Sequence, residues 1–127
     1  MSRHNLDFGK SSENAAGIYL RAQGYKILEV NYRNKLGEID IVAQEAKTVC
    51  FIEVKSRSSV RRGLPQEAVN KHKQYKISRC ALIYIKERRL FEQSCRFDVL
   101  AIIKDRENQL SFELIKDAFE LDSRYSY

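Results

Sequence analysis

Two apolar segments joined by a short polar connection, GEIDIVAQEAKTVCFIEVKSR at residues 37–57, constrain this chain more than any other feature. EIDIVA and VCFIEVK have the apolar content of buried strands, and QEAK is short enough to connect them as a hairpin. Charged residues nevertheless stand inside both segments: Asp40 in the first, and Glu53 and Lys55 in the second. Such groups are seldom buried without a partner, so the hairpin raises the question of what they contact.

The expected turn sets the register of this hairpin. A tight turn at residues 46–47 places Asp40 opposite Glu53 on the neighbouring strand. The same register places Glu38 opposite Lys55. Directly opposed side chains have Cβ atoms roughly 4.5 to 5.5 Å apart, and like charges at that distance destabilise the pair. Two opposed carboxylates therefore require a cation.

A divalent metal ion fits this pair of acids. Mg²⁺ is usually held by one or two carboxylates, keeps several waters and completes its shell with phosphate oxygens, and Mn²⁺ can take its place. Asp40 and Glu53 are therefore the expected metal ligands. Lys55 lies two residues from Glu53 on the same strand face, where its ammonium can orient an attacking water, help its deprotonation or stabilise charge on phosphorus. Glu38 is placed around this site, opposite Lys55.

A structural interpretation of the same residues remains open. Because side chains alternate across a strand, Ile39 and Ile41 take the face opposite Asp40. Glu53 and Lys55 could then be solvated residues on the open face of a half-exposed sheet, with Glu38 and Lys55 forming a cross-strand ion pair.

The remaining pattern predicts one domain over residues 1–127, with short flexible ends. SSENAAGIYLRAQGY predicts a helix that Ser11 or Ser12 caps and that ends at Gly24. Asn70 caps a second helix through KHKQYKISRCALIYIKE, and strands are expected around residues 25–33, 95–103 and 110–119. The order helix, three strands, helix, two strands predicts an α/β fold with a central mixed sheet flanked by helices.

Glu13 stands on the first expected helix, on the stripe of Ala16 and Leu20 that should face the sheet. An acid on an inner stripe calls for a partner, which makes Glu13 a candidate member of the site. The alternative is a solvated first-turn glutamate that interacts favourably with the helix dipole.

Net charge of +6 and a pI near 9.3 favour contact with phosphates. Basic residues follow the hairpin, in the loop SRSSVRRGLP and at the start of the second helix, where lysines oppose the helix dipole unless an anion is bound. Gln66 follows the loop and is a candidate to hydrogen-bond the metal ligands without binding the metal itself. The alternative is a solvated basic face. The candidate phosphate contacts are Arg57, Arg61, Arg62, Lys71, Lys73 and Lys76.

Three widely spaced cysteines, Cys50, Cys80 and Cys95, predict reduced thiols, and no histidine lies near them at a zinc-type spacing. Arg96 and Asp98, two residues apart in CRFDVLAI, are expected to form a structural pair. The chain has neither a secretory signal pattern nor an apolar run of membrane-spanning length. These features predict a cytoplasmic protein that does not enter membranes.

The segments GKSSENAAGIYL, GEIDIVA, FIEVKSR, EAVNKHK and CRFDVLAI, in this order, resemble the YraN-type bacterial family of the restriction-endonuclease-like PD-(D/E)XK nuclease superfamily. The resemblance covers residues 9–119 and implies a restriction-endonuclease-like core, Mg²⁺-dependent hydrolysis of phosphodiester bonds and a DNA substrate. Asp40 and Glu53 match the metal-binding acids, and Lys55 matches the motif lysine. Glu13 matches the helix acid of members similar to Holliday-junction resolvases. Ile39 replaces the proline of the superfamily motif.

Three functions are compatible with these residues. The first is a metal-dependent endonuclease, selective for DNA structure such as branches and paired as a homodimer in the manner of the resolvase-like relatives. The second is a nucleic-acid-binding module that has the nuclease fold without turnover. The third is an interaction protein whose basic face docks an acidic partner.

Overall fold

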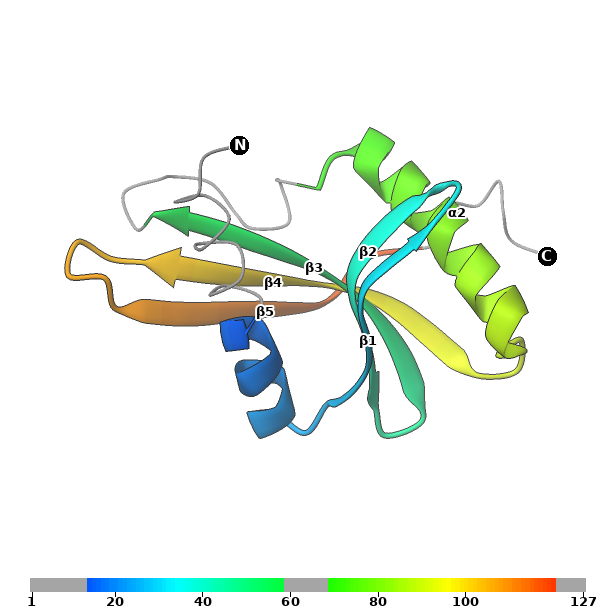
Figure 1. Ribbon diagram of the computed structural model, residues 1–127, viewed down its shortest axis with the longest axis horizontal. Helices are drawn as coiled ribbons and strands as arrows, with labels where there is room; N and C mark the ends of the chain where they lie inside the picture. The colour runs from blue at the N-terminus through cyan, green and yellow to red at the C-terminus, as the bar shows by residue number, and fades with distance from the viewer. Residues whose placement is uncertain (1–13, 59–68, 121–127) are drawn as a thin grey trace.

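The computed structural model describes residues 14–58 and 69–120, which form an α/β fold around one sheet (Figure 1). Helical residues 14–22, here called the N-terminal helix, precede the first strand. The strands are β1 (Lys26–Asn34), β2 (Gly37–Glu45), β3 (Thr48–Ser58), β4 (Ser94–Lys104) and β5 (Leu110–Phe119). Along the chain, the helix α2 (Lys71–Arg88) follows β3 and precedes β4. The predicted order of elements is confirmed.

The five strands are ordered β1-β2-β3-β4-β5, with β3 and β4 parallel and the other neighbours antiparallel. A parallel pair needs a long connection from one end of the sheet to the other, and α2 lies within this one. The mixed sheet predicted from the sequence is therefore confirmed.

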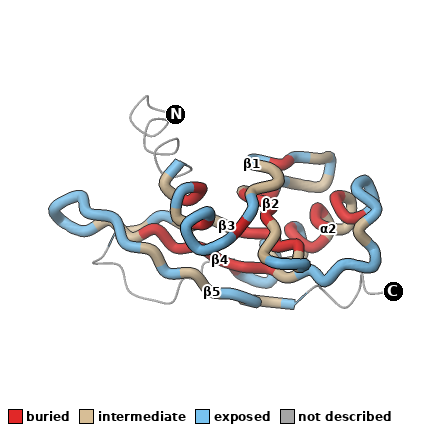
Figure 2. The backbone as a smooth tube through the Cα atoms, turned by 90° about the horizontal axis from the view of Figure 1, so that it is seen from below, coloured by how far each residue is buried: buried red, intermediate tan, exposed pale blue. Residues whose placement is uncertain are grey.

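Apolar side chains on both faces of the sheet are buried. Val49 and Phe51 of β3 pack in a cluster with α2, whereas Cys50 and Ile52 pack in a second cluster with Leu20 of the N-terminal helix. Because adjacent residues of a strand point to opposite faces, the two helices cover opposite sides of the sheet. Figure 2 shows the buried residues concentrated in the central strands and along the inner side of α2.

The second helix follows the expected pattern closely. The side chain of Asn70 accepts a hydrogen bond from the N–H of Lys73 at 3.0 Å, as an N-cap does. The predicted inner-face residues Ile77, Cys80 and Ala81 are buried. The cap therefore fixes where the helix begins and which lysines follow it.

The hairpin of β2 and β3 has the predicted register only in part. Main-chain pairing runs from Glu45 opposite Thr48 to Ile41 opposite Ile52, and it ends there. Beyond this point β2 continues beside β1, while β3 continues to Ser58 beside β4. Figure 1 shows the β1–β2 hairpin turning away from β3. The sheet therefore forks next to the position where the acids stand.

The fork corrects one expectation about the faces of β2. Ile39 belongs to the cluster under α2, whereas Ile41 belongs to the cluster on the other face. Strict alternation would put both on one face. The bending of β2 away from β3 at Asp40 breaks that alternation.

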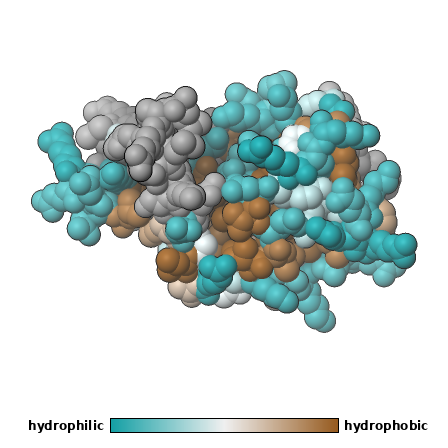
Figure 3. All heavy atoms as spheres, viewed as in Figure 1, coloured by the Kyte–Doolittle hydropathy of each residue, from teal (hydrophilic) through white to brown (hydrophobic). Residues whose placement is uncertain are grey.

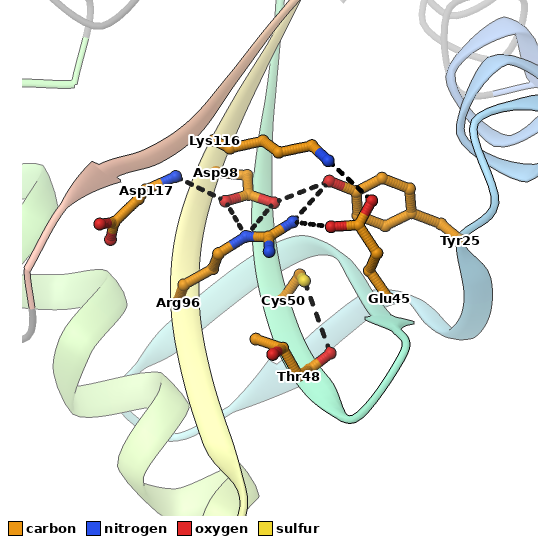
Figure 4. A network of polar contacts seen from close by, with 8 residues as sticks. All are labelled: Tyr25, Glu45, Thr48, Cys50, Arg96, Asp98, Lys116 and Asp117. Atoms are coloured by element: carbon orange, nitrogen blue, oxygen red, sulfur yellow. Dashed lines mark hydrogen bonds and ion pairs between the residues drawn. The ribbon is translucent and has the colours of Figure 1, made fainter.

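A buried polar network occupies the face of the N-terminal helix (Figure 4). Asp98 is fully buried, and its carboxylate accepts hydrogen bonds from Arg96 at 2.9 Å and from the Tyr25 hydroxyl at 3.2 Å. The N–H of Asp117 donates to the same carboxylate at 2.9 Å, and Arg96 also pairs with Glu45 at 2.7 Å. A buried charge with this many partners is structural. The predicted Arg96 and Asp98 pair is confirmed.

Candidate metal and phosphate site

The acid pair stands where the sheet forks. Asp40 is the first residue of β2 past the end of its main-chain pairing with β3. Its Oδ2 accepts a hydrogen bond from the main-chain N–H of Val54 on β3 at 2.8 Å. This side chain therefore satisfies a main-chain donor that the departing strand no longer reaches. The hydrogen bond holds the carboxylate of Asp40 beside β3, next to Glu53.

Glu53 and Asp40 are close enough to repel each other. Burial, and then the negative charge of Asp40, raise the pKa of Glu53 from its ordinary value to about 7. The positive charges of Lys55 and Lys73 lower this pKa, but they do not offset the first two effects. A cation bound beside the two carboxylates would therefore favour the charged form of Glu53.

Lys55 and Lys73 converge on this pair from different elements. The pKa of Lys73 is lowered because its side chain lies within hydrogen-bonding reach of Lys55 and feels the charge of Lys55. The negative charge of Glu53 acts on Lys73 in the opposite direction. A residue of β3 and a residue of α2 thus place two ammonium groups beside one carboxylate. Glu53 is therefore an anion that these two ammonium groups share.

A cavity of about 670 Å³ opens next to Glu53. The β1–β2 turn forms one wall and the beginning of α2 forms the other, so we call it the turn–helix cavity. Its lining residues are Arg33, Asn34, Lys35, Leu36, Gly37, Glu38, Glu53, Lys73, Lys76 and Ile77. Lys73 and Lys76, predicted as phosphate contacts, therefore share a cavity with a predicted metal ligand.

The sequence motifs did not predict that the basic residues of the β1–β2 turn belong to the site. Arg33 and Lys35 come from NYRNK, directly before the hairpin motif, and both line the turn–helix cavity. Two basic residues immediately before an acidic motif are the sequence feature that could have predicted positive charge beside the acids. Their position depends on β1 pairing with β2, which carries the turn beside α2.

The other predicted site residues lie in different places. Glu38 forms an ion pair with Arg33 at 2.9 Å, which corrects the expected pairing with Lys55. Arg57 approaches Glu113 of β5 at 3.9 Å, and Lys71 is exposed in the first turn of α2. Neither lines the turn–helix cavity. Three further predicted residues and the helix acid, namely Arg61, Arg62, Gln66 and Glu13, lie outside the described residues.

The donor set fits a hard divalent ion that shares its shell with a ligand. Within residues 14–58 and 69–120, no group of three or more His, Cys, Asp or Glu residues is placed to hold a metal. Asp40 and Glu53 offer two carboxylates on neighbouring strands, which is the number that Mg²⁺ commonly takes from a protein when phosphate oxygens and water supply the rest. The pair is therefore suited to binding metal together with a phosphate.

Gly37, the glycine of the hairpin motif, joins the site to α2. Its φ of 152° is a backbone conformation that other residues rarely adopt, and a Cβ there would lie 3.9 Å from the carbonyl oxygen of Lys76. We expect Gly37→Ala to lower the free energy of unfolding by about 1 to 2 kcal/mol, measured by urea denaturation. The matched change Gly17→Ala, in the N-terminal helix without a positive φ, should be neutral or stabilising. Equal losses in both variants would contradict this account of Gly37.

Together, the forked mixed sheet, the helices on its two faces and the acid pair with its lysine define an α/β protein with a restriction-endonuclease-like core. The chain belongs to the uncharacterised protein family UPF0102, whose model matches residues 12–102. That range includes the acid pair and the turn–helix cavity. The family membership that the sequence motifs indicate is therefore confirmed.

Relatives of similar length match nearly all of the chain. A UPF0102 protein of Syntrophus aciditrophicus is 50% identical over 117 residues, which cover 92% of this chain and 91% of that protein. A UPF0102 protein of Clostridium kluyveri is 45% identical over 122 residues, covering 95% and 100%. Another from Desulforapulum autotrophicum is 43% identical, covering 96% and 100%.

All three cysteines are free thiols, as predicted. In the part of the chain that the structure describes, neither helix is long and apolar enough to cross a membrane.

Proposed function

We propose that this protein is a metal-dependent endonuclease that hydrolyses phosphodiester bonds of DNA. The observation that carries the proposal is the meeting of Asp40, Glu53 and Lys55 where β2 leaves β3. Two repelling carboxylates in a partly buried place are costly unless a cation is bound. An ammonium beside them is the group that a reaction at phosphorus can use.

Each of the three residues has a distinct role in this proposal. Asp40 and Glu53 hold Mg²⁺ or Mn²⁺, which when bound supplies a Lewis acid for the phosphate and lowers the pKa of water. Lys55 orients the attacking water or stabilises negative charge on the phosphate. The hydrogen bond from the N–H of Val54 holds the carboxylate of Asp40 in place. The resemblance to the nuclease superfamily implies products with a 3′-hydroxyl and a 5′-phosphate.

The expected substrate is DNA whose structure departs from a plain duplex, such as a branch. Lys73 and Lys76 provide positive charge beside the acid pair, where backbone phosphates would lie. We place the protein in the cytoplasm, where free thiols such as those of its three cysteines persist. A homodimer would present two such sites to the two strands of a branched substrate.

A cleavage assay tests the proposal directly. Purified protein is incubated with supercoiled plasmid and with an end-labelled branched oligonucleotide, in Mg²⁺, in Mn²⁺ or in EDTA. We expect nicked and cut products that appear only when a divalent metal is present. Metal-independent binding of both DNAs without any product would instead support the second function, a nucleic-acid-binding module without turnover. Binding that weakens steeply with salt would count against an acidic protein partner.

A further inference from the structure

We propose that the turn–helix cavity binds unpaired nucleotides of the DNA strand next to the phosphate that is cut. The inference rests on the proposed function, and it adds the substrate feature that the site selects. Glu53 stands in the wall of the cavity, whereas Asp40 and Lys55 do not, so a strand lying in the cavity would pass one carboxylate of the acid pair.

The walls of the turn–helix cavity are tied to each other. The Asn34 side chain donates to the main-chain carbonyl of Cys80 in α2 at 3.2 Å and accepts the N–H of Leu36 at 2.9 Å. A Cβ at Gly37 would lie at an ordinary van der Waals distance, 3.9 Å, from the Lys76 carbonyl oxygen in the same region. These contacts fix the β1–β2 turn against α2 without a ligand. A cavity whose walls are already in position loses little ordering entropy on binding.

The charge of the walls suits a phosphodiester backbone. Four of the lining residues are basic, namely Arg33, Lys35, Lys73 and Lys76, and two are acidic, namely Glu38 and Glu53. Glu38 is paired with Arg33, and the charge of Glu53 acts on Lys73. Lys35 and Lys76 add positive charge on the two opposite walls. The first turn of α2 contains no acidic residue to neutralise its lysines. Figure 3 shows hydrophilic side chains over the β1–β2 hairpin and the start of α2.

The size of the cavity favours an unpaired strand over a duplex. A volume of about 670 Å³ lies within the range of about 300 to 1,000 Å³ typical of small-ligand sites, which admits one or two nucleotides. A base inside a duplex is stacked on both faces, whereas an unpaired base can turn one face toward the wall of the cavity. Leu36 adds half-buried apolar surface on the wall formed by the turn, against which a sugar or an unstacked base can pack. Unpaired nucleotides at a branch or flap meet all of these conditions.

A binding experiment in EDTA tests the inference without requiring cleavage. The double variant Lys35→Ala/Lys76→Ala removes one lysine from each wall. The matched control Lys47→Ala/Lys86→Ala removes one lysine from the other hairpin turn and one from the last turn of α2, with the same change of net charge. Fluorescence anisotropy measures the Kd of each protein for a labelled single-stranded oligonucleotide and for a blunt duplex of equal length.

We expect the cavity variant to weaken single-strand binding by about 10-fold or more and to reduce the salt slope by about 1.4, as loss of two phosphate contacts predicts. Duplex binding by the same variant, and both measurements for the control, should change by less than about 2-fold. Lys35→Arg/Lys76→Arg, which keeps the charges, should retain binding. Circular dichroism and thermal melting check that each variant folds.

Either of two results would overturn the inference. One is an equal loss of binding in the cavity variant and its control, which would indicate a diffuse electrostatic surface. The other is an equal loss for single strand and duplex in the cavity variant. Failure of the proposed function looks different: selective, cavity-dependent binding of single strands with no cleavage in Mg²⁺ or Mn²⁺ would reject the nuclease and leave the cavity assignment standing.

Discussion

Asp40→Asn and Glu53→Gln are each expected to lower the rate of Mg²⁺-dependent DNA cleavage by more than about 10³-fold. Both changes keep the shape of the side chain and remove its negative charge. The amide of the Asp40→Asn variant would still offer an oxygen to the N–H of Val54, so the fork of the sheet should be preserved. The loss would therefore report on metal binding rather than on folding. Single-turnover cleavage of a labelled oligonucleotide measures it.

Lys55→Ala separates metal binding from the chemistry that follows. We expect it to lower the cleavage rate by about 10² or more, while Mn²⁺ still gives heat in a calorimetric titration. In the same titration, Asp40→Asn should give no heat. The matched controls are Glu29→Gln, an acid of β1 paired with Arg88 at 2.9 Å, and Lys26→Ala, an exposed lysine of the same strand. Unchanged cleavage in Asp40→Asn or Lys55→Ala would refute the residue assignments.

Local patterns predicted the parts of the fold that depend on neighbours in the sequence. The turn at residues 46–47 and the alternation of apolar residues set the register from Ile41 opposite Ile52 to Glu45 opposite Thr48. The Asn70 cap likewise depends only on the residues that follow it. The fork was not predictable in this way. It arises because β2 follows β1 while β3 follows β4, and neither pairing can be read from the hairpin's own residues.

In the candidate site, too, the contacts within one strand were predictable from the sequence, and the contacts between elements were not. Glu53 and Lys55 share a strand face, so their proximity follows from the strand itself. Lys73 lies beside them because α2 packs on that face of the sheet. The sequence pattern predicted Lys73 only as a phosphate contact, separate from the acid pair. Glu38 was assigned to Lys55 by extending the ladder beyond its end, whereas β1 supplies its partner, Arg33. Lys73 was therefore misjudged because it meets the site through three-dimensional packing. The Arg33–Glu38 pair is local, since the two residues lie opposite each other in the β1–β2 hairpin, and it was missed because the hairpin of β2 and β3 was extended too far.

Glu53→Gln is also expected to stabilise the fold at pH 8 when no divalent metal is present, by about 1 to 3 kcal/mol. The folded-state pKa of Glu53 is raised to about 7, first by burial and then by the charge of Asp40. Between the ordinary pKa of a glutamate, near 4.5, and this value, the folded chain holds a proton that the unfolded chain has lost. The stability of the wild-type protein therefore falls as the pH rises through this window, and it stays lowered above pH 7.

Because glutamine does not titrate, the stability difference between Glu53→Gln and wild type should be larger at pH 8 than at pH 5 when both are unfolded by urea in EDTA. Mn²⁺ should then reverse the order at pH 8, since an ion that binds only the folded wild type stabilises it by mass action and gives the variant nothing. Glu29→Gln, which breaks a surface ion pair, should show neither effect. A glutamate that lowers the free energy of unfolding of the metal-free protein and raises that of the metal-bound protein is a metal ligand. A pH-independent difference, insensitive to Mn²⁺, would mean that Glu53 is an ordinary partly buried side chain.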